Sequence, residues 1–153
     1  HYDYVLLDLG RQINAVSIRA LDQSDTIYPV LQQSLPHLRD CRRLLDIFHS
    51  LGYRKEKIQL VLNRYASSSA LGVNEIERVL DQRISYRIPN NYDVANESIN
   101  QGTPVLQLAR SSTIAKALAE WVNRLTEASP ANRGGSIIRR IFVRNPAGSE
   151  MTR

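Results

Sequence analysis

Short apolar runs alternate with amphipathic segments along this chain. The runs at residues 4–9, 26–31, 58–62 and 84–88 are short and continuous, which is typical of strands buried on both faces. Elsewhere apolar residues recur every three or four positions, and this spacing predicts helices over residues 13–21, 34–51, 73–80, 94–100 and 114–125. Strands that alternate with helices form βαβ units. The pattern therefore predicts the α/β class, a three-layer parallel sheet with helices on both faces.

The helix predicted over residues 34–51 has the clearest boundaries. Ser34 is a typical N-cap residue, and Pro36 falls in the first turn, where its missing N–H costs nothing. Gly52 follows the last turn as a C-terminal glycine. The predicted buried face consists of Leu38, Cys41, Leu45 and Phe48. We interpret Cys41 as a small core residue rather than a reactive thiol.

The character of the sequence changes after Pro130. Of the net charge of +5, +4 comes from the residues after position 128, so the body of the chain is almost neutral. We therefore divide the chain into a folded domain at 1–127 and a flexible basic tail at 128–153. Within the tail lies a segment at residues 137–144, from Ile137 to Arg144, in which a helix would place the apolar residues on one face and the arginines on the other side. This segment is interpreted either as an amphipathic helix that contacts a membrane surface or as a disordered tail or short strand.

Bulk composition excludes several classes of protein. Of the 153 residues 42% are hydrophobic, which suits one domain with a sizeable core. No apolar run approaches the roughly 20 residues of a membrane span, and the single cysteine excludes an intrachain disulfide. A cytoplasmic setting is expected. The near-neutral body argues against direct binding of nucleic acid.

Polar residues follow three of the predicted strands. Asp8 ends the first, Asn63 follows the third, and Pro89 with Asn90 follows the fourth. The carboxyl ends of parallel strands face one crevice, where α/β proteins bind ligands. Asp8 could hold a metal ion, or it could simply cap the next helix or a turn. Asn63 could pair with a nucleobase edge. The alternative for Asn63, and for Pro89 with Asn90, is that they are only turn residues without a ligand.

No arrangement of catalytic residues stands out. His37 and His49 are interpreted as surface residues, and residues 67–69 (Ser-Ser-Ser) as a loop. None of the seven glycines forms the glycine-rich run before Lys and Ser or Thr that cradles phosphates. No catalytic residue is therefore predicted, and this chain alone is expected neither to bind a nucleoside triphosphate tightly nor to hydrolyse it.

Four short motifs, in this order, carry a resemblance. YDYVLLDLGR at residues 2–11, LVLNRY at 60–65, IPNNY at 88–92 and NQGTP at 100–104 resemble the MinD/ParA-type P-loop ATPases. The most similar subgroup is that of the Flp/Tad pilus assembly proteins CpaE and TadZ. The resemblance covers about residues 2–126. It implies the P-loop NTPase fold with its N-terminal part, including the P-loop, absent from this chain.

The resemblance also assigns roles to individual residues. Asp8 matches the Walker B acid near magnesium, Asn63 matches the amide that recognises adenine, and Pro89 and Asn90 match the segment that packs beside the base. Many relatives have Asp-x-Pro where this chain has Asp8, Leu9 and Gly10. The cofactors implied for the full-length protein are ATP and Mg²⁺. The strand of the phosphate loop would lie upstream, beside the strand at 4–9, so we expect the chain to be a fragment.

The implied function is that of a localisation protein for the Flp/Tad (type IVb) pilus secretion machine, an ATP-responsive scaffold. It would be a cytoplasmic homodimer, located at a cell pole and peripheral to the inner membrane, with Tad components as partners. The first alternative is an active ParA/MinD-family ATPase that positions DNA or division proteins. The second is an α/β binding module that binds no nucleotide.

Overall fold

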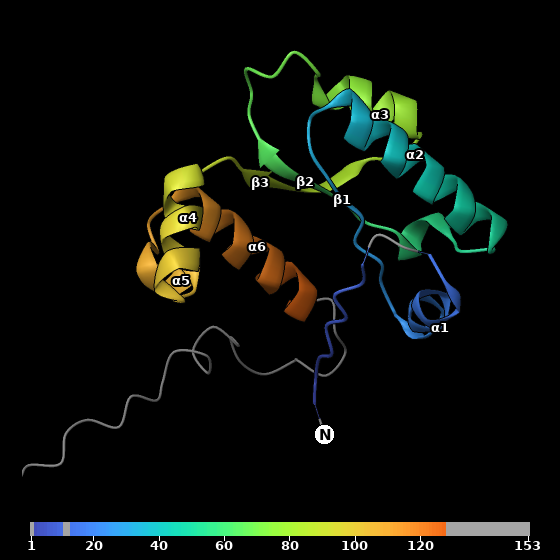
Figure 1. Cartoon of the computed structure of the whole chain (residues 1–153), viewed down its shortest axis with the longest axis horizontal. Coiled ribbons are helices and arrows are strands. Elements are labelled where there is room, and N and C mark those ends of the chain that lie inside the picture. Colours follow the sequence, from blue (N-terminus) through green and yellow to red (C-terminus); the bar gives the residue numbers. More distant parts are fainter. Residues whose placement is uncertain (1, 11–12, 128–153) are drawn as a thin grey trace, which may run out of the picture.

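The computed structural model describes residues 2–10 and 13–127 of the chain (Figure 1). The elements follow one another as α1 (Ala15–Gln23), β1 (Val30–Leu31), α2 (Leu35–Ser50), the 3₁₀ turn η1 (Lys55–Lys57), β2 (Leu60–Tyr65), α3 (Val73–Leu80), β3 (Ile84–Pro89), α4 (Tyr92–Gln101), α5 (Val105–Leu108) and α6 (Thr113–Glu127). Within the described residues strands and helices alternate, as the sequence predicts for βαβ units.

The three strands form one parallel sheet in the order β1-β2-β3. Val30 pairs with Val61, and Leu60 pairs with Ile84, with register irregularities further along β2 and β3. In Figure 1, α2 and α3 cover one face of the sheet, and α6 covers the other with α4 and α5 beside it. The predicted α/β class, with a parallel sheet and helices on both faces, is therefore confirmed.

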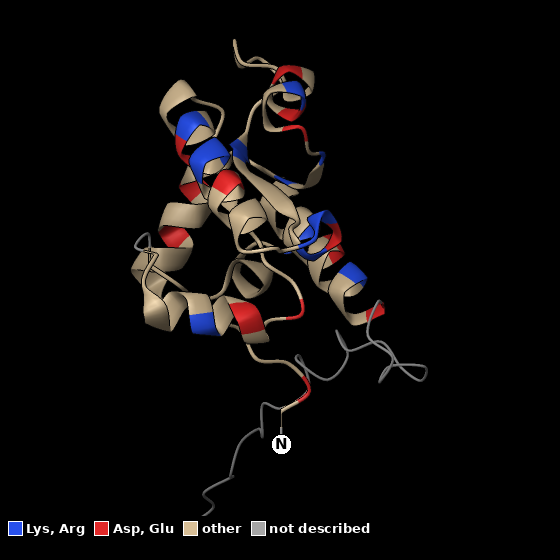
Figure 2. Cartoon of the chain, turned by 90° about the vertical axis from the view of Figure 1, so that its right-hand side faces the viewer, with Lys and Arg blue, Asp and Glu red and all other residues tan. Residues whose placement is uncertain are grey.

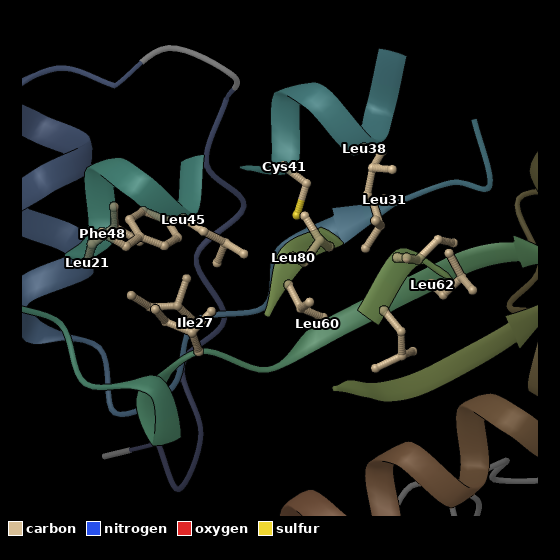
Figure 3. Close-up of a cluster of buried hydrophobic side chains, with 13 residues drawn as sticks. Leu21, Ile27, Leu31, Leu38, Cys41, Leu45, Phe48, Leu60, Leu62 and Leu80 are labelled. Carbon is tan, nitrogen blue, oxygen red and sulfur yellow. The ribbon is translucent and has the colours of Figure 1, made fainter. Parts of the chain in front are cut away.

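Helix α2 carries the larger hydrophobic core on its inner face. Its predicted buried residues are all buried, Leu45 and Phe48 almost completely. Gly52 has φ +79°, and the N–H of Tyr53 returns to the carbonyl of Phe48, so the predicted glycine ends the helix. The cluster in Figure 3 joins this face to β1, β2 and α3, and its central members are Leu31, Leu38, Cys41, Leu45, Phe48, Leu60, Leu62, Ile76 and Leu80.

An aromatic cluster packs on the opposite face of the sheet. The Trp121 ring of α6 stacks on Tyr86 of β3 with ring centroids 5.1 Å apart and meets Tyr28 edge-on at 5.3 Å. The guanidinium of Arg124, one helical turn further on, lies over the Tyr86 ring at 5.8 Å. Such pairs stabilise beyond the area they bury. They hold α6 against β3.

The predicted strand at residues 4–9 is wrong for this structure. The described residues 2–10 form no strand or helix, and all of them are exposed; Leu6 exposes 89% of its surface and Val5 71%. A strand requires a neighbour that satisfies its backbone N–H and C=O groups. Among the described strands β1 pairs only with β2, and nothing pairs with its outer edge.

Smaller differences concern helix ends. Helix α1 begins two residues later than predicted, because Asn14 caps it: its Oδ1 accepts from the N–H groups of Val16 and Ser17. The short helix α5 is missing from the sequence prediction. Ser34 is the N-cap of α2, but its hydroxyl bonds to His37 Nδ1 at 2.7 Å instead of to the helix backbone. The tail at 128–153 and its segment 137–144 lie outside the described residues.

Candidate nucleotide-binding edge

Three of the four predicted site residues lie at one edge of the sheet, where β2 and β3 end. Asn63 belongs to β2, Pro89 ends β3, and Asn90 follows it. Tyr65 and Pro89 are partners in the parallel register, and the N–H of Asn90 donates to the Tyr65 carbonyl at 2.9 Å. This backbone contact joins the two strand ends directly. The carboxyl edge is the place where α/β sheets bind ligands.

The side-chain amide of Asn63 has a defined orientation. Its oxygen Oδ1 accepts a hydrogen bond from the backbone N–H of Arg64 at 2.9 Å. Only the oxygen end can accept from an N–H, so the contact also fixes where Nδ2 lies. The half-buried Asn63 therefore keeps two N–H donors and one lone pair of Oδ1. These are the groups with which an amide pairs with a nucleobase edge.

The two asparagines after β3 differ in their roles. Asn91 is the N-cap of α4, and its side chain accepts a long hydrogen bond of 3.5 Å from the N–H of Val94. The exposed Asn90 makes no side-chain hydrogen bond to another described residue, while its backbone N–H donates to the Tyr65 carbonyl. Asn90 is therefore the member of the pair whose side chain is free to meet a ligand.

Sequence reasoning missed three residues at this edge. The Arg87 guanidinium lies over the Tyr65 ring at 5.7 Å, and both Arg87 and Arg64 are exposed. Guanidinium groups bind phosphates and stack on aromatic rings. Gln33, just beyond β1, bonds to the loop after β2. Two of these residues could have been noticed in the sequence, because Arg64 and Arg87 are the charged residues of the two strand sequences LVLNRY and ISYRIP.

Asp8 is not at a strand end in this structure. It is exposed within the coil of residues 2–10, because the strand predicted there does not form. Its assignment to magnesium stays a prediction. Among the described residues no group of three or more His, Cys, Asp or Glu side chains is placed to hold a metal ion.

A shallow depression lies at the opposite edge of the sheet, near the amino ends of β2 and β3. Its walls include an ion pair between Lys55 Nζ and Asp81 Oδ2 at 2.5 Å. The hydrogen bond from Lys55 and its charge hold the pKa of Asp81 below its usual value. This depression is separate from the predicted site, which lies at the other ends of the same strands.

Charged side chains are interspersed on the described helices. Figure 2 shows Lys and Arg beside Asp and Glu on several of these helices. Two ion pairs, Arg42–Asp46 and Arg124–Glu120, join residues one helical turn apart and lie on the surface. This distribution agrees with the near-neutral charge of the body of the chain.

Comparisons with known proteins show which proteins this chain is similar to. No protein-family model matches the chain. It is 26% identical over 130 residues to the septum site-determining protein MinD of Thermotoga maritima, covering 82% of this chain and 47% of that protein. A ParA family ATPase from Chlorobium tepidum superposes with a TM-score of 0.75 at 34% identity, covering 81% of this chain and 51% of that one. The chain is a relative of the MinD/ParA-type P-loop ATPases.

A second solved relative shows the same fold. The septum site-determining protein MinD of Pyrococcus horikoshii, complexed with Mg-ADP, matches with a TM-score of 0.59 at 23% identity, over 74% of this chain and 47% of that protein. The present chain thus spans about half the length of these MinD/ParA relatives. Among its described residues no helix is long and apolar enough to cross a membrane.

Proposed function

We propose that Asn63, Pro89 and Asn90 form the adenine-binding side of a nucleotide site. One observation carries the proposal: the hydrogen bond from the N–H of Asn90 to the carbonyl of Tyr65, which joins the ends of β2 and β3 in a relative of the MinD/ParA-type ATPases. The donors of Asn63 Nδ2 suit the ring nitrogens of adenine, which are acceptors. Pro89 offers an apolar ring beside the base, and Asn90 offers a free amide.

In the full-length protein, ATP and Mg²⁺ are the proposed cofactors. The magnesium ion would neutralise phosphate charge, with Asp8 as a carboxylate on its side of the site. The solved relative that is complexed with Mg-ADP supports this choice of ligand. The residues of this chain include no glycine-rich phosphate loop. The base side is therefore the part of the site that this chain contributes.

Nuclear magnetic resonance of the ¹⁵N-labelled chain tests the base site, with adenosine as the probe and guanosine as its control. We expect adenosine to shift the side-chain amide resonances of Asn63 and Asn90. The variant Asn63→Asp retains an oxygen for the Arg64 N–H and removes both donors. It should weaken adenosine binding about tenfold, as expected for the loss of one or two hydrogen bonds. Unshifted Asn63 and Asn90 resonances in the wild type would contradict the proposal.

The matched control is Asn74→Asp, which makes the same change of charge on α3. It should leave the affinity for adenosine unchanged. If both variants weaken binding equally, the added charge rather than the lost donors is responsible, and Asn63 is not a base contact.

A thermal shift measurement addresses the phosphate side. A ligand that binds only the folded state raises the melting temperature. Because the chain has no phosphate loop, ATP with Mg²⁺ should raise its melting temperature no more than adenosine does at the same concentration. A larger shift with ATP and Mg²⁺ would mean that this chain binds the triphosphate by other groups.

For the full-length protein we propose the role of a Flp/Tad pilus localisation factor, a nucleotide-responsive homodimer with Tad components as partners. The support is the resemblance of the four short motifs to those of CpaE and TadZ-like proteins. A peripheral, polar position at the inner membrane belongs to the same proposal, with the segment at 137–144 as its membrane contact. The test is liposome co-sedimentation of the full-length dimer with and without Phe142→Asp. Unchanged sedimentation would remove this segment from the proposal.

The second candidate is an active ATPase that positions DNA or division proteins. The similarity to the ParA family ATPase and to MinD supports it. The two candidates predict different sequence features and activities for the full-length protein. An intact phosphate loop with its lysine, together with measurable ATP hydrolysis by the full-length protein, favours the ATPase, whereas a receiver-like domain favours the pilus factor.

A further inference from the structure

The side chain of Gln33 connects the segment after β1 to the loop after β2 through both ends of its amide. Gln33 lies two residues beyond β1 and is half-buried. Its Oε1 accepts from the backbone N–H of Ala66 at 2.8 Å, and its Nε2 donates to the backbone carbonyl of Leu71 at 2.9 Å. A neutral amide supplies an acceptor and a donor together. An aliphatic side chain supplies neither, and a carboxylate supplies only acceptors.

The two contacts enclose the loop between β2 and α3. Residues 67–69, the three serines, lie between Ala66 and Leu71, and Ser67 and Ser68 are exposed. Leu71 also packs against the hydrophobic core. Gln33 therefore joins both ends of this loop to the segment just after β1, in addition to the covalent connections to β2 and α3.

Ala66 lies just after an irregular end of β2 that needs external support. Arg64 has φ +52°, a left-handed conformation that side chains other than glycine adopt at a cost in free energy. Asn63 Oδ1 holds the N–H of Arg64, the N–H of Asn90 holds the carbonyl of Tyr65, and Gln33 holds the N–H of Ala66. Strained backbone persists where the surroundings fix it in this way, and it is common at functional sites.

We propose that Gln33 is a positioning residue for the adenine side of the site. Its amide fixes the backbone just after Asn63, and with it the direction of the Asn63 donors and the position of the serine loop beside them. Gln33 itself does not touch the base. This inference rests on the proposed function, because it assigns to Gln33 the geometry of that same site.

The experiment uses three variants of the whole chain and adenosine as the probe. Gln33→Leu removes both hydrogen bonds at similar volume. We expect it to raise the Kd for adenosine about tenfold, the factor for losing one to two hydrogen bonds of ordinary strength, and to speed the hydrogen exchange of the Ala66 amide. Gln32→Leu is the matched control, because the Gln32 side chain makes no hydrogen bond to the described residues. It should change neither the Kd for adenosine nor the hydrogen exchange of the Ala66 amide.

Gln33→Glu adds a readout that a general loss of stability would not produce. The ionised carboxylate of this variant can accept from the Ala66 N–H but repels the Leu71 carbonyl. When the carboxyl group is protonated, its hydroxyl donates to that carbonyl, and the hydrogen bonds of the wild type are restored. The adenosine Kd of this variant should therefore return toward the wild-type value as the pH falls from about 7.5 to about 4, just below the ordinary glutamate pKa, while the wild type shows no such recovery.

The outcomes separate the two proposals. If the wild type shows no response to adenosine, the proposed function fails and the role of Gln33 fails with it. If the wild type and Gln33→Leu bind adenosine equally well, although exchange at Ala66 is faster in the variant, only the positioning role is overturned. Equal binding by Gln33→Glu at both pH values would overturn it as well.

Discussion

The side-chain oxygen of Asn63 accepts a hydrogen bond from the backbone N–H of the next residue, Arg64, which has φ +52°. A side chain seldom bonds to its immediate neighbour, and here the bond accompanies a left-handed residue at the end of a strand. Asn63 therefore has two tasks. It stabilises the left-handed conformation of Arg64 through its oxygen and leaves its nitrogen available to a ligand.

The first prediction concerns the strain at Arg64. Glycine adopts positive φ at almost no cost, whereas alanine pays the same penalty as arginine. We expect Arg64→Gly to be more stable than Arg64→Ala by about 1 kcal/mol, measured as free energies of unfolding in urea. The control pair is Arg87→Gly and Arg87→Ala in β3, where glycine should be the less stable. Greater stability of alanine at both positions would contradict strain at Arg64.

A second prediction concerns the core side of α3. Ile76 is fully buried, and Val79 on the same helix exposes 43% of its surface. Ile76→Ala should lower the free energy of unfolding by about 2–5 kcal/mol through lost burial and the cavity left behind. Val79→Ala should cost less than about 1 kcal/mol, because much of the surface it removes is already near water. Similar losses in the two variants would mean that Ile76 does not face the core.

Cys41 supplies a third prediction, on pH dependence. Burial raises the pKa of its thiol from the ordinary 9.0 to about 11. Between about pH 9 and pH 11 the unfolded chain therefore loses the thiol proton while the folded chain keeps it. The stabilisation from this group is complete below pH 9 and is lost as the pH rises toward 11.

Urea titrations at pH 8 and pH 10.5 measure this effect. Burial also raises the pKa values of Tyr28 and Tyr53. Their ionisation in the unfolded chain therefore lowers the stability of the protein in the same alkaline range. The quantity of interest is therefore the difference between wild type and Cys41→Ala. The wild type should lose more stability over this range than the variant. Equal losses would show that the thiol is accessible to solvent.

The fourth prediction is a coupling energy across the aromatic cluster. Tyr86 and Trp121 stack at 5.1 Å, and such pairs contribute about 0.5–1.5 kcal/mol beyond the area they bury. A double-mutant cycle with Tyr86→Leu and Trp121→Leu should recover a coupling in that range. In the control cycle Phe48→Leu replaces Tyr86→Leu. Phe48 belongs to α2, on the other side of the sheet, so its effect on stability should add to that of Trp121→Leu. Additivity in both cycles would contradict the stacking.

Periodicity predicted the described α-helices other than α5, and it predicted the three paired strands, because burial imposes it. Leu38, Cys41, Leu45 and Phe48 recur at helical spacing since one face of α2 meets the sheet. Residues 4–9 have an equally apolar pattern, yet they form no strand. An apolar pattern reports a preference for burial, but a strand also needs a partner for its backbone. The pattern of residues 4–9 contains no information about that partner.

The candidate site was predictable where it depends on strand order alone. Parallel strands place their carboxyl ends at one edge, so Asn63 and the Pro89–Asn90 step could be expected together from the sequence alone. The role of Gln33 could not be expected. Its two contacts, to Ala66 and Leu71, join residues more than thirty positions apart, and they depend on the conformation of the loop rather than on any local pattern.

The exposed segment at residues 4–9 has a consequence for handling the protein. A short, exposed run of apolar, strand-forming residues whose backbone is not paired in a sheet is the kind of sequence that pairs with copies of itself and aggregates. Two acids interrupt or flank this run: Asp3 precedes it, and Asp8 lies within it. Charges in these positions act as gatekeepers. Replacing Asp8 with Asn would therefore remove protection against aggregation as well as a carboxylate.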